Sequence, residues 1–279
     1  MKKPFEKFIK WITHLFVYLN CFLVFTCCNF SSHKTKKLEL NPVLNKLYNY
    51  SFAKTSVMQF PYNGAAYTKY DTILLNFSMQ KFNNSDSVTT FKVTCNHFKW
   101  RSDVNYIRDS LHLKPITISM NDSGTVMQVL HADELLQDIE KDSATQNNLT
   151  GVLPDYISEN GIKDLFNKIF ALLPVKKVNE NDTWVRNKIR LAKAPISVSN
   201  LYVLKSFGHD SAMINIQSYV SARQSVGDVT YLKGDENGYV IVNYSTGMPL
   251  LFETQSDVVT ATNYYDIKSN EHIVVKLNN

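Results

Sequence analysis

The feature that most limits the fold of this chain is an alternation of apolar and polar residues with a period of two. Within residues 72–82, Ile73, Leu75, Phe77 and Met79 occupy every second position. Successive side chains of a β-strand point to opposite faces of the sheet, so this spacing is typical of a strand with one buried face. Related strand patterns recur in residues 47–60, 87–100, 116–120, 126–129, 183–191, 200–207, 212–222, 239–244, 250–258 and 271–277. We therefore expect long antiparallel strands in a meander.

The period changes in the middle of the chain. Residues 132–142 place Leu135 and Ile139 among acidic residues, which predicts a helix. Residues 154–173 carry apolar side chains at spacings of three and four, and Pro174 follows them, which predicts a second and longer helix. Strands, helices and strands in this order indicate an α+β fold, in which two or so helices from about residues 132–173 cover a large antiparallel sheet.

The first 26 residues have the parts of a secretory signal. Four lysines make the first ten residues basic, and residues 11–26 are mostly apolar and uncharged. A helix of that length spans roughly 24 Å, which is short of the roughly 30 Å hydrocarbon core of a bilayer. We therefore predict a cleaved signal peptide in preference to a permanent membrane anchor.

The apolar stretch ends in Cys27 and Cys28, and this junction resembles a bacterial lipobox. Val24 stands at the aliphatic position for Cys27, whereas Phe25 and Thr26 depart from the small residues of the strict pattern. We predict lipidation at Cys27, with Cys28 as the alternative. In the alternative without lipidation, both cysteines are ordinary residues near a cleavage site or in an uncleaved anchor. The predicted layout is a signal peptide at 1–26, a lipid anchor and tether at 27–37, and a single β-rich domain with a central helical segment at 38–279.

The charge and the cysteine content bound the function classes. The whole chain carries +5, and the four lysines and one glutamate of residues 1–26 contribute +3 of it. The rest of the chain is thus nearly neutral and gives no reason to expect a nucleic-acid partner. Beyond residue 28, Cys95 is the one cysteine, so the domain has no internal disulfide. We expect Cys95 to be a small buried hydrophobe rather than a reactive thiol.

The sequence lacks the short motifs of nucleotide-binding loops, serine hydrolases and zinc proteases. Cys95 and His97 share a strand face, but zinc needs further ligands. We therefore predict no metal, no cofactor and no enzymatic activity. Four aromatic residues could line a cavity, although strand aromatics more often fill the core: Tyr48, Phe77, Trp100 and Trp184.

Several short motifs resemble an uncharacterised family of Bacteroidetes-type envelope lipoproteins. They are the turn at 121–124 followed by Val126, the pair Leu173-Pro174, the segment 178–184 and the turn at 244–247, within about residues 38–277. In that family a Gly-Asp-x-Trp element opens the second set of strands, and this chain has Asn181 in place of the glycine. The resemblance implies no catalytic residue. At the level of the fold it is similar to the LolA/LolB-like lipoprotein carriers, which implies a curved sheet, half-barrel or barrel-like, around an apolar cavity.

Together these features predict a non-enzymatic lipoprotein that binds a lipid or another apolar ligand. Acyl chains such as palmitate would anchor it to the periplasmic face of the outer membrane, because each buried CH₂ contributes about 0.8 kcal/mol. Its expected partners are membrane lipid through this acylation, and a lipid or an envelope protein. The alternative function is a structural or protein-interaction module of the envelope without a ligand pocket. The alternative locations are the cell surface and the medium.

Overall fold

The computed structural model describes residues 35–62, 65–85, 87–102, 106–107, 114–134, 158–191, 195–222, 229–262 and 266–278. The predicted signal peptide, Cys27 and Cys28 lie outside these residues. Residues Lys36–Asn279 form one compact unit. Lys36 and Lys37, which the predicted layout places in the tether, are thus part of the folded unit.

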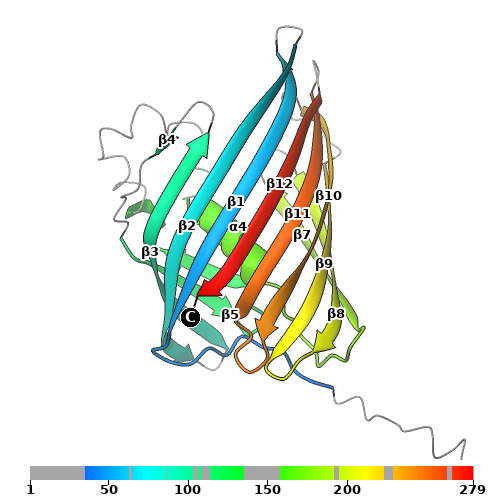
Figure 1. Ribbon diagram of the computed structural model, residues 1–279. Helices are drawn as coiled ribbons and strands as arrows, with labels where there is room; N and C mark the ends of the chain where they lie inside the picture. The colour runs from blue at the N-terminus through cyan, green and yellow to red at the C-terminus, as the bar shows by residue number, and fades with distance from the viewer. Residues whose placement is uncertain are drawn as a thin grey trace, which may run out of the picture. The chain divides into compact units, whose positions relative to one another are not determined.

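The unit is built around one large sheet (Figure 1). Its strands are β1 (Leu47–Tyr62), β2 (Ala65–Ser85), β3 (Val88–Ser102), β4 (Tyr106–Ile107), β5 (Ile116–Asn121), β6 (Val126–Leu130), β7 (Thr183–Leu191), β8 (Pro195–Phe207), β9 (Ser211–Ala222), β10 (Val229–Asn243), β11 (Pro249–Thr262) and β12 (Asp266–Asn278). Helix α4 covers Glu159–Phe170. Neighbouring strands are antiparallel, and their order is β6-β5-β3-β2-β1-β12-β11-β10-β9-β8-β7, with β4 beside β3.

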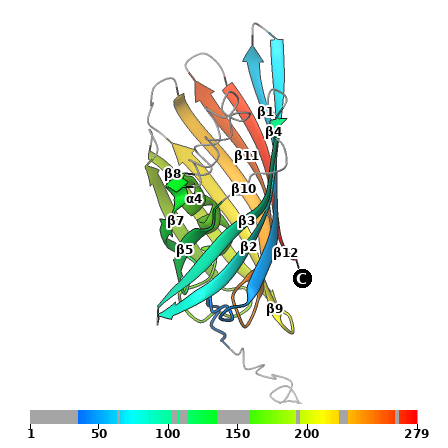
Figure 2. The ribbon, with the colours of Figure 1, turned by 90° about the vertical axis from the view of Figure 1, so that its left-hand side faces the viewer.

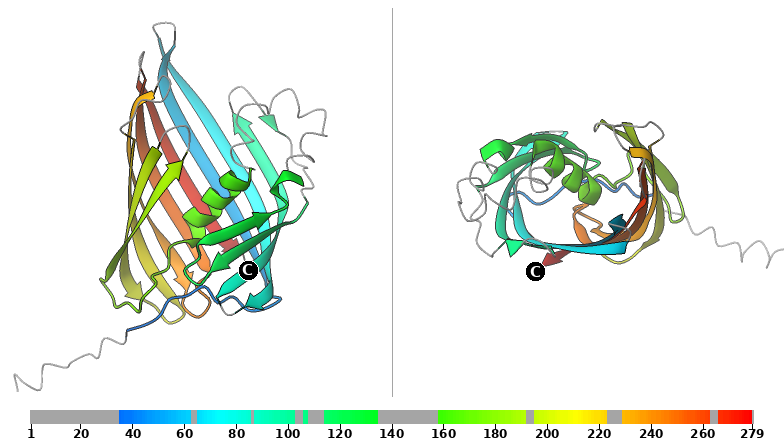
Figure 3. Two further views of the ribbon diagram at one scale, coloured as in Figure 1. Left: turned by 180° about the vertical axis from the view of Figure 1, so that it is seen from behind. Right: turned by 90° about the horizontal axis from the view of Figure 1, so that it is seen from above.

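The pairing of β1 with β12 joins the first and last strands into one sheet. The sheet therefore runs without a break from β6 to β7, which are its two edges. Seen from above, it curves around α4 and is not closed (Figure 3). The side view in Figure 2 shows the long strands of one half rising beyond the helix. The predicted fold class, an α+β fold with a large curved antiparallel sheet, is confirmed.

Most predicted strands occur, but several are longer than the alternation indicated. β10 begins at Val229 rather than at Tyr239. The alternation did not indicate its first part, because Gly234, Glu236 and Gly238 interrupt the apolar pattern there. β1 continues through Pro61 to Tyr62. Pro61 lies near the tip of the β1–β2 hairpin, where one side of the strand requires no hydrogen bond from the proline nitrogen. A bulge in the β2–β3 pairing at Asn76 and Phe77 changes which residues of β3 face inward.

Helix α4 covers the lower half of the concave face, near the start of β1 (Figure 3). Ser158 caps it, because its hydroxyl oxygen accepts a hydrogen bond from the Gly161 amide at 3.1 Å. Its buried face packs into the sheet: Phe166 contacts Phe77, and Phe170 contacts Tyr50 at a ring distance of 6.0 Å. The predicted helix 154–173 is thus shorter at its end, and residues 151–157 lie outside the described residues. Of the other predicted helix, 132–142, residues 132–134 are described and helical.

The motifs that carried the family resemblance lie near the lower end of α4. Gly124 has φ +78° and approaches the Phe170 carbonyl so closely that a Cβ would overlap with it. Asn181 has φ +68°, a left-handed conformation that glycine favours and asparagine tolerates. Trp184 donates its indole N–H to the Leu172 carbonyl at 2.9 Å. These residues therefore close the base of the core.

The segment before β1 completes this base. Lys36 pairs with Val178 through two backbone hydrogen bonds. The Leu40 amide donates to the Asp122 carbonyl at 2.7 Å, and Leu38 and Leu40 are buried in the core. The start of the folded unit is thus held against the turns at 121–124 and 244–247 and against the chain that follows α4.

Candidate functional site: a polar row on the concave face

A row of polar residues crosses the concave face of the sheet at the height of the middle of β1. The strand register places one residue from each strand between β7 and β2 side by side. In sheet order, this polar row consists of Arg186, Asn200, Ser218, Glu236, Ser256, Glu271, Ser56 and Asp71. Burying such groups costs free energy unless they find partners, so the row needs an explanation.

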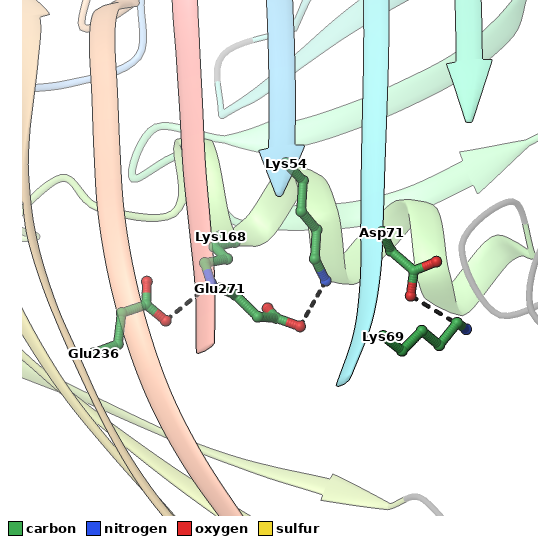
Figure 4. A network of polar contacts seen from close by, with 6 residues as sticks. All are labelled: Lys54, Lys69, Asp71, Lys168, Glu236 and Glu271. Atoms are coloured by element: carbon green, nitrogen blue, oxygen red, sulfur yellow. Dashed lines mark hydrogen bonds and ion pairs between the residues drawn. The ribbon is translucent and has the colours of Figure 1, made fainter. Parts of the chain in front are cut away.

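Ion pairs provide partners for the three carboxylates of the row (Figure 4). Lys54 of β1 lies 2.8 Å from Glu271, Lys168 of α4 lies 2.9 Å from Glu236, and Lys69 lies 3.2 Å from Asp71 on the same strand. The six side chains are largely buried, with exposures between 11% and 29%. Each carboxylate of the row thus has its own lysine.

The Asp71 carboxylate is not fully satisfied. Its Oδ1 atom is buried and has no hydrogen-bond partner among the described residues. The row therefore retains one acceptor for a donor that the described chain does not supply.

Arg186 forms the β7 end of the row and joins the two edges of the sheet. Its guanidinium donates to the Thr125 hydroxyl at 3.0 Å, to the Ser123 carbonyl at 3.4 Å and to the Leu173 carbonyl. Burial lowers the pKa of this guanidinium below its ordinary value, and the acceptors are neutral. Burial also raises the pKa of the neighbouring Tyr202 phenol to about 12, so this group adds no charge at neutral pH.

The concave face is apolar both below and above the polar row. Below it, Phe52, Phe252 and Val275 are buried in the core against α4. Above it, the next two rows of inward-facing positions are mostly apolar and only half-buried. We call these the upper rows; their half-buried apolar members include Met58, Phe60, Val198, Val220, Leu232, Val258 and Ile267.

The aromatic residues proposed as cavity lining or core lie at or below the height of Trp100. Tyr48, Phe77 and Trp100 are at most 3% exposed and belong to the core. Trp184 is half-buried and stacks on Tyr202 with ring centroids 5.7 Å apart. The upper rows were not singled out in the sequence, because their residues look like any other inward positions of a strand.

Cys95 also belongs to the inward-facing side of β3. Burial raises the pKa of its thiol to about 11, more than the hydrogen bond to the His97 carbonyl lowers it. The thiol is therefore protonated at neutral pH, the form that is a poor nucleophile.

A shallow pocket of about 410 Å³ lies on the convex side. Lys92, Lys114, His131 and Glu134 contribute its polar lining, and the wall is completed by Phe82, Pro115 and Thr117. His131 Nδ1 lies 3.0 Å from Glu134 Oε1, and this contact holds the pKa of the Glu134 carboxyl below its ordinary value. These ionic groups are about half exposed, so water screens them strongly. The polar row is therefore the stronger candidate.

Within the described residues, no three histidine, cysteine or acidic side chains are arranged to hold a metal ion. No helix in the same part of the chain is long and apolar enough to cross a membrane.

Residues 67–249 of the 279-residue chain match a Family of unknown function (DUF6263). The chain belongs to the DUF6263 family. The match begins within β2 and ends at the first residue of β11, so it includes α4 and both turns at the base. The expectation of an uncharacterised family is confirmed, and the description of DUF6263 assigns it no activity. No curated protein matches this DUF6263 member.

Three solved structures are similar to this DUF6263 member. Lipovitellin, in a structure titled for its lipid-protein interactions, matches 85% of this chain and 25% of its own at 9% identity, with a TM-score of 0.48. The translocator domain of the autotransporter NalP from Neisseria meningitidis matches 86% of this chain and 90% of its own at 5% identity, with a TM-score of 0.34. An outer membrane channel from Pseudomonas putida F1 matches 86% of this chain and 98% of its own at 8% identity, with a TM-score of 0.23. The chain thus spans about a quarter of the lipovitellin chain.

Proposed function

We propose that this protein is a non-enzymatic lipoprotein of the cell envelope, and that the upper rows of its concave face bind the acyl chain of a lipid. The observation that carries the proposal is the pairing of half-buried apolar side chains, such as Met58 and Val258, with the polar row directly beneath them. An apolar tail and a polar head would meet matching surfaces there.

The envelope location rests on the start of the sequence. The basic and apolar segments of residues 1–26 and the lipobox-like junction at Cys27 favour export and acylation. With two or more acyl chains, the anchor would hold the folded unit at a membrane, for which we propose the periplasmic face of the outer membrane.

The anchor is tested on the mature protein expressed from the full chain in a Gram-negative host. We expect its N-terminal peptide to begin at an acylated cysteine, and Cys27→Ser to abolish acylation while Cys28→Ser preserves it. Mass spectrometry of the N-terminal peptide measures this. The reverse pattern would move the anchor to Cys28, and an unmodified N-terminus in all three proteins would contradict the lipoprotein.

The acyl site is tested with neighbouring residues on opposite faces of β11. Val258 faces the concave side and Val259 the convex side, and both are half-buried. We expect Val258→Asp to weaken binding of a fluorescent acyl probe about tenfold, because it places a charge beside the tail. Val259→Asp should leave the affinity within about twofold.

The measurement is fluorescence titration on the full chain with both Cys27 and Cys28 replaced by serine, purified without detergent. Equal losses in the two aspartate variants would contradict acyl binding on the concave face. Absence of any probe binding would instead favour the structural or protein-interaction module.

A further inference from the structure

The three carboxylates of the polar row are each compensated by a lysine. Three lysines and three carboxylates form three ion pairs with N···O distances between 2.8 and 3.2 Å. The fourth cation, Arg186, donates hydrogen bonds from its guanidinium to neutral oxygens, where the two edges of the sheet are joined. A ligand that reaches the row between Glu236 and Asp71 therefore meets paired charges rather than a field of one sign.

A charged head group would be at a disadvantage on such a surface. It would lose its hydration and would have to displace one member of a largely buried pair, which leaves the other member without a partner. A polar head group without net charge avoids that cost. Ser256 and Ser56 stand between the pairs, and their hydroxyl groups can form hydrogen bonds. Asn200 and Ser218 add an amide and a hydroxyl between Arg186 and Glu236.

We propose that the concave face selects amphiphiles whose head group carries no net charge, such as a monoacylglycerol, over fatty acids and alkylamines of the same chain length. This inference rests on the proposed acyl-binding function. The internal ion pairs act as a specificity device, because they penalise a charged competitor rather than improve contacts with the neutral ligand.

Three probes of equal chain length test the selection on the full chain with Cys27 and Cys28 replaced by serine: a monoacylglycerol, a fatty acid and a primary alkylamine. Each displaces the fluorescent acyl probe at neutral pH below its micelle concentration. We expect the monoacylglycerol to bind about tenfold more tightly than either charged probe. Equal or tighter binding of a charged probe would overturn the selection, although acyl binding itself would stand. No binding of any probe would overturn the proposed function as well.

Breaking one ion pair should change the preference in a predictable direction. Glu236→Gln removes the carboxylate beside Lys168, so the fatty acid should gain about tenfold relative to the monoacylglycerol. Lys168→Met removes the cation beside Glu236, so the alkylamine should gain instead. Glu253→Gln, which removes a carboxylate from the convex side of β11, is the matched control and should change neither ratio.

The relative affinities of the three probes within each variant are the readout, so a general loss of stability does not imitate the effect. The two variants remove opposite charges of one ion pair, and either variant alone carries the prediction if the other does not fold. Unchanged ratios in the folded variants would overturn the role of the ion pairs.

Discussion

Replacing Gly124 with alanine should destabilise the protein by about 3 kcal/mol or more, or prevent it from folding. The residue has φ +78°, which alanine adopts only under strain, and an added Cβ would overlap with the Phe170 carbonyl at the end of α4. Neither problem can be relieved locally, because Phe170 is 2% exposed and fixed in the core. Chemical denaturation followed by circular dichroism measures the change in the free energy of unfolding.

Gly208→Ala is the matched control for this substitution. Gly208 lies in the exposed turn between β8 and β9, has no positive φ, and its added Cβ would approach the movable Ser211 hydroxyl at 2.9 Å. We expect a change within about 0.5 kcal/mol. If Gly124→Ala unfolded at the same denaturant concentration as the wild type, that result would contradict the close packing of this turn against α4.

Replacing Arg186 with methionine should lower the free energy of unfolding by about 3 kcal/mol. Methionine keeps much of the aliphatic stem, but the carbonyls of Ser123 and Leu173 lose their donor. The two edges of the sheet also lose the side chain that links β7 to the turn before β6. Hydrogen exchange should therefore rise first in β6 and β7, before the pairing of β1 with β12 opens.

Arg101→Met provides the comparison for that loss. Arg101 is exposed on β3, and removal of its charge should change the stability by no more than about 0.5 kcal/mol. Equal effects of the two substitutions would show that Arg186 acts through its general charge and not through its three acceptors.

The alternation of residues predicted most strands and their inward faces. Ile73, Leu75, Phe77 and Met79 do share the concave side of β2. The signal failed where polar or small residues enter the inward phase, as in the first half of β10, because periodicity detects apolar side chains and not backbone pairing.

Parts of the polar row were visible in the sequence as defects in the alternation. Glu271 is in phase with Ile273 and Val275, and Ser218 is in phase with Ile214 and Ile216. Each could have been an ordinary end of a buried face. Their alignment depends on the register of every strand pair between them, which is a sum of long-range contacts.

The sequence by itself determined the α+β class, the meander of strands and the position of the covering helix, because local periodicity encodes them. Only the tertiary structure decided that β1 pairs with β12, that Arg186 joins the two sheet edges, and that paired charges cross the concave face. These features join residues as far apart as Lys54 and Glu271. Such contacts arise from strand order and register, and no short stretch of the chain contains them.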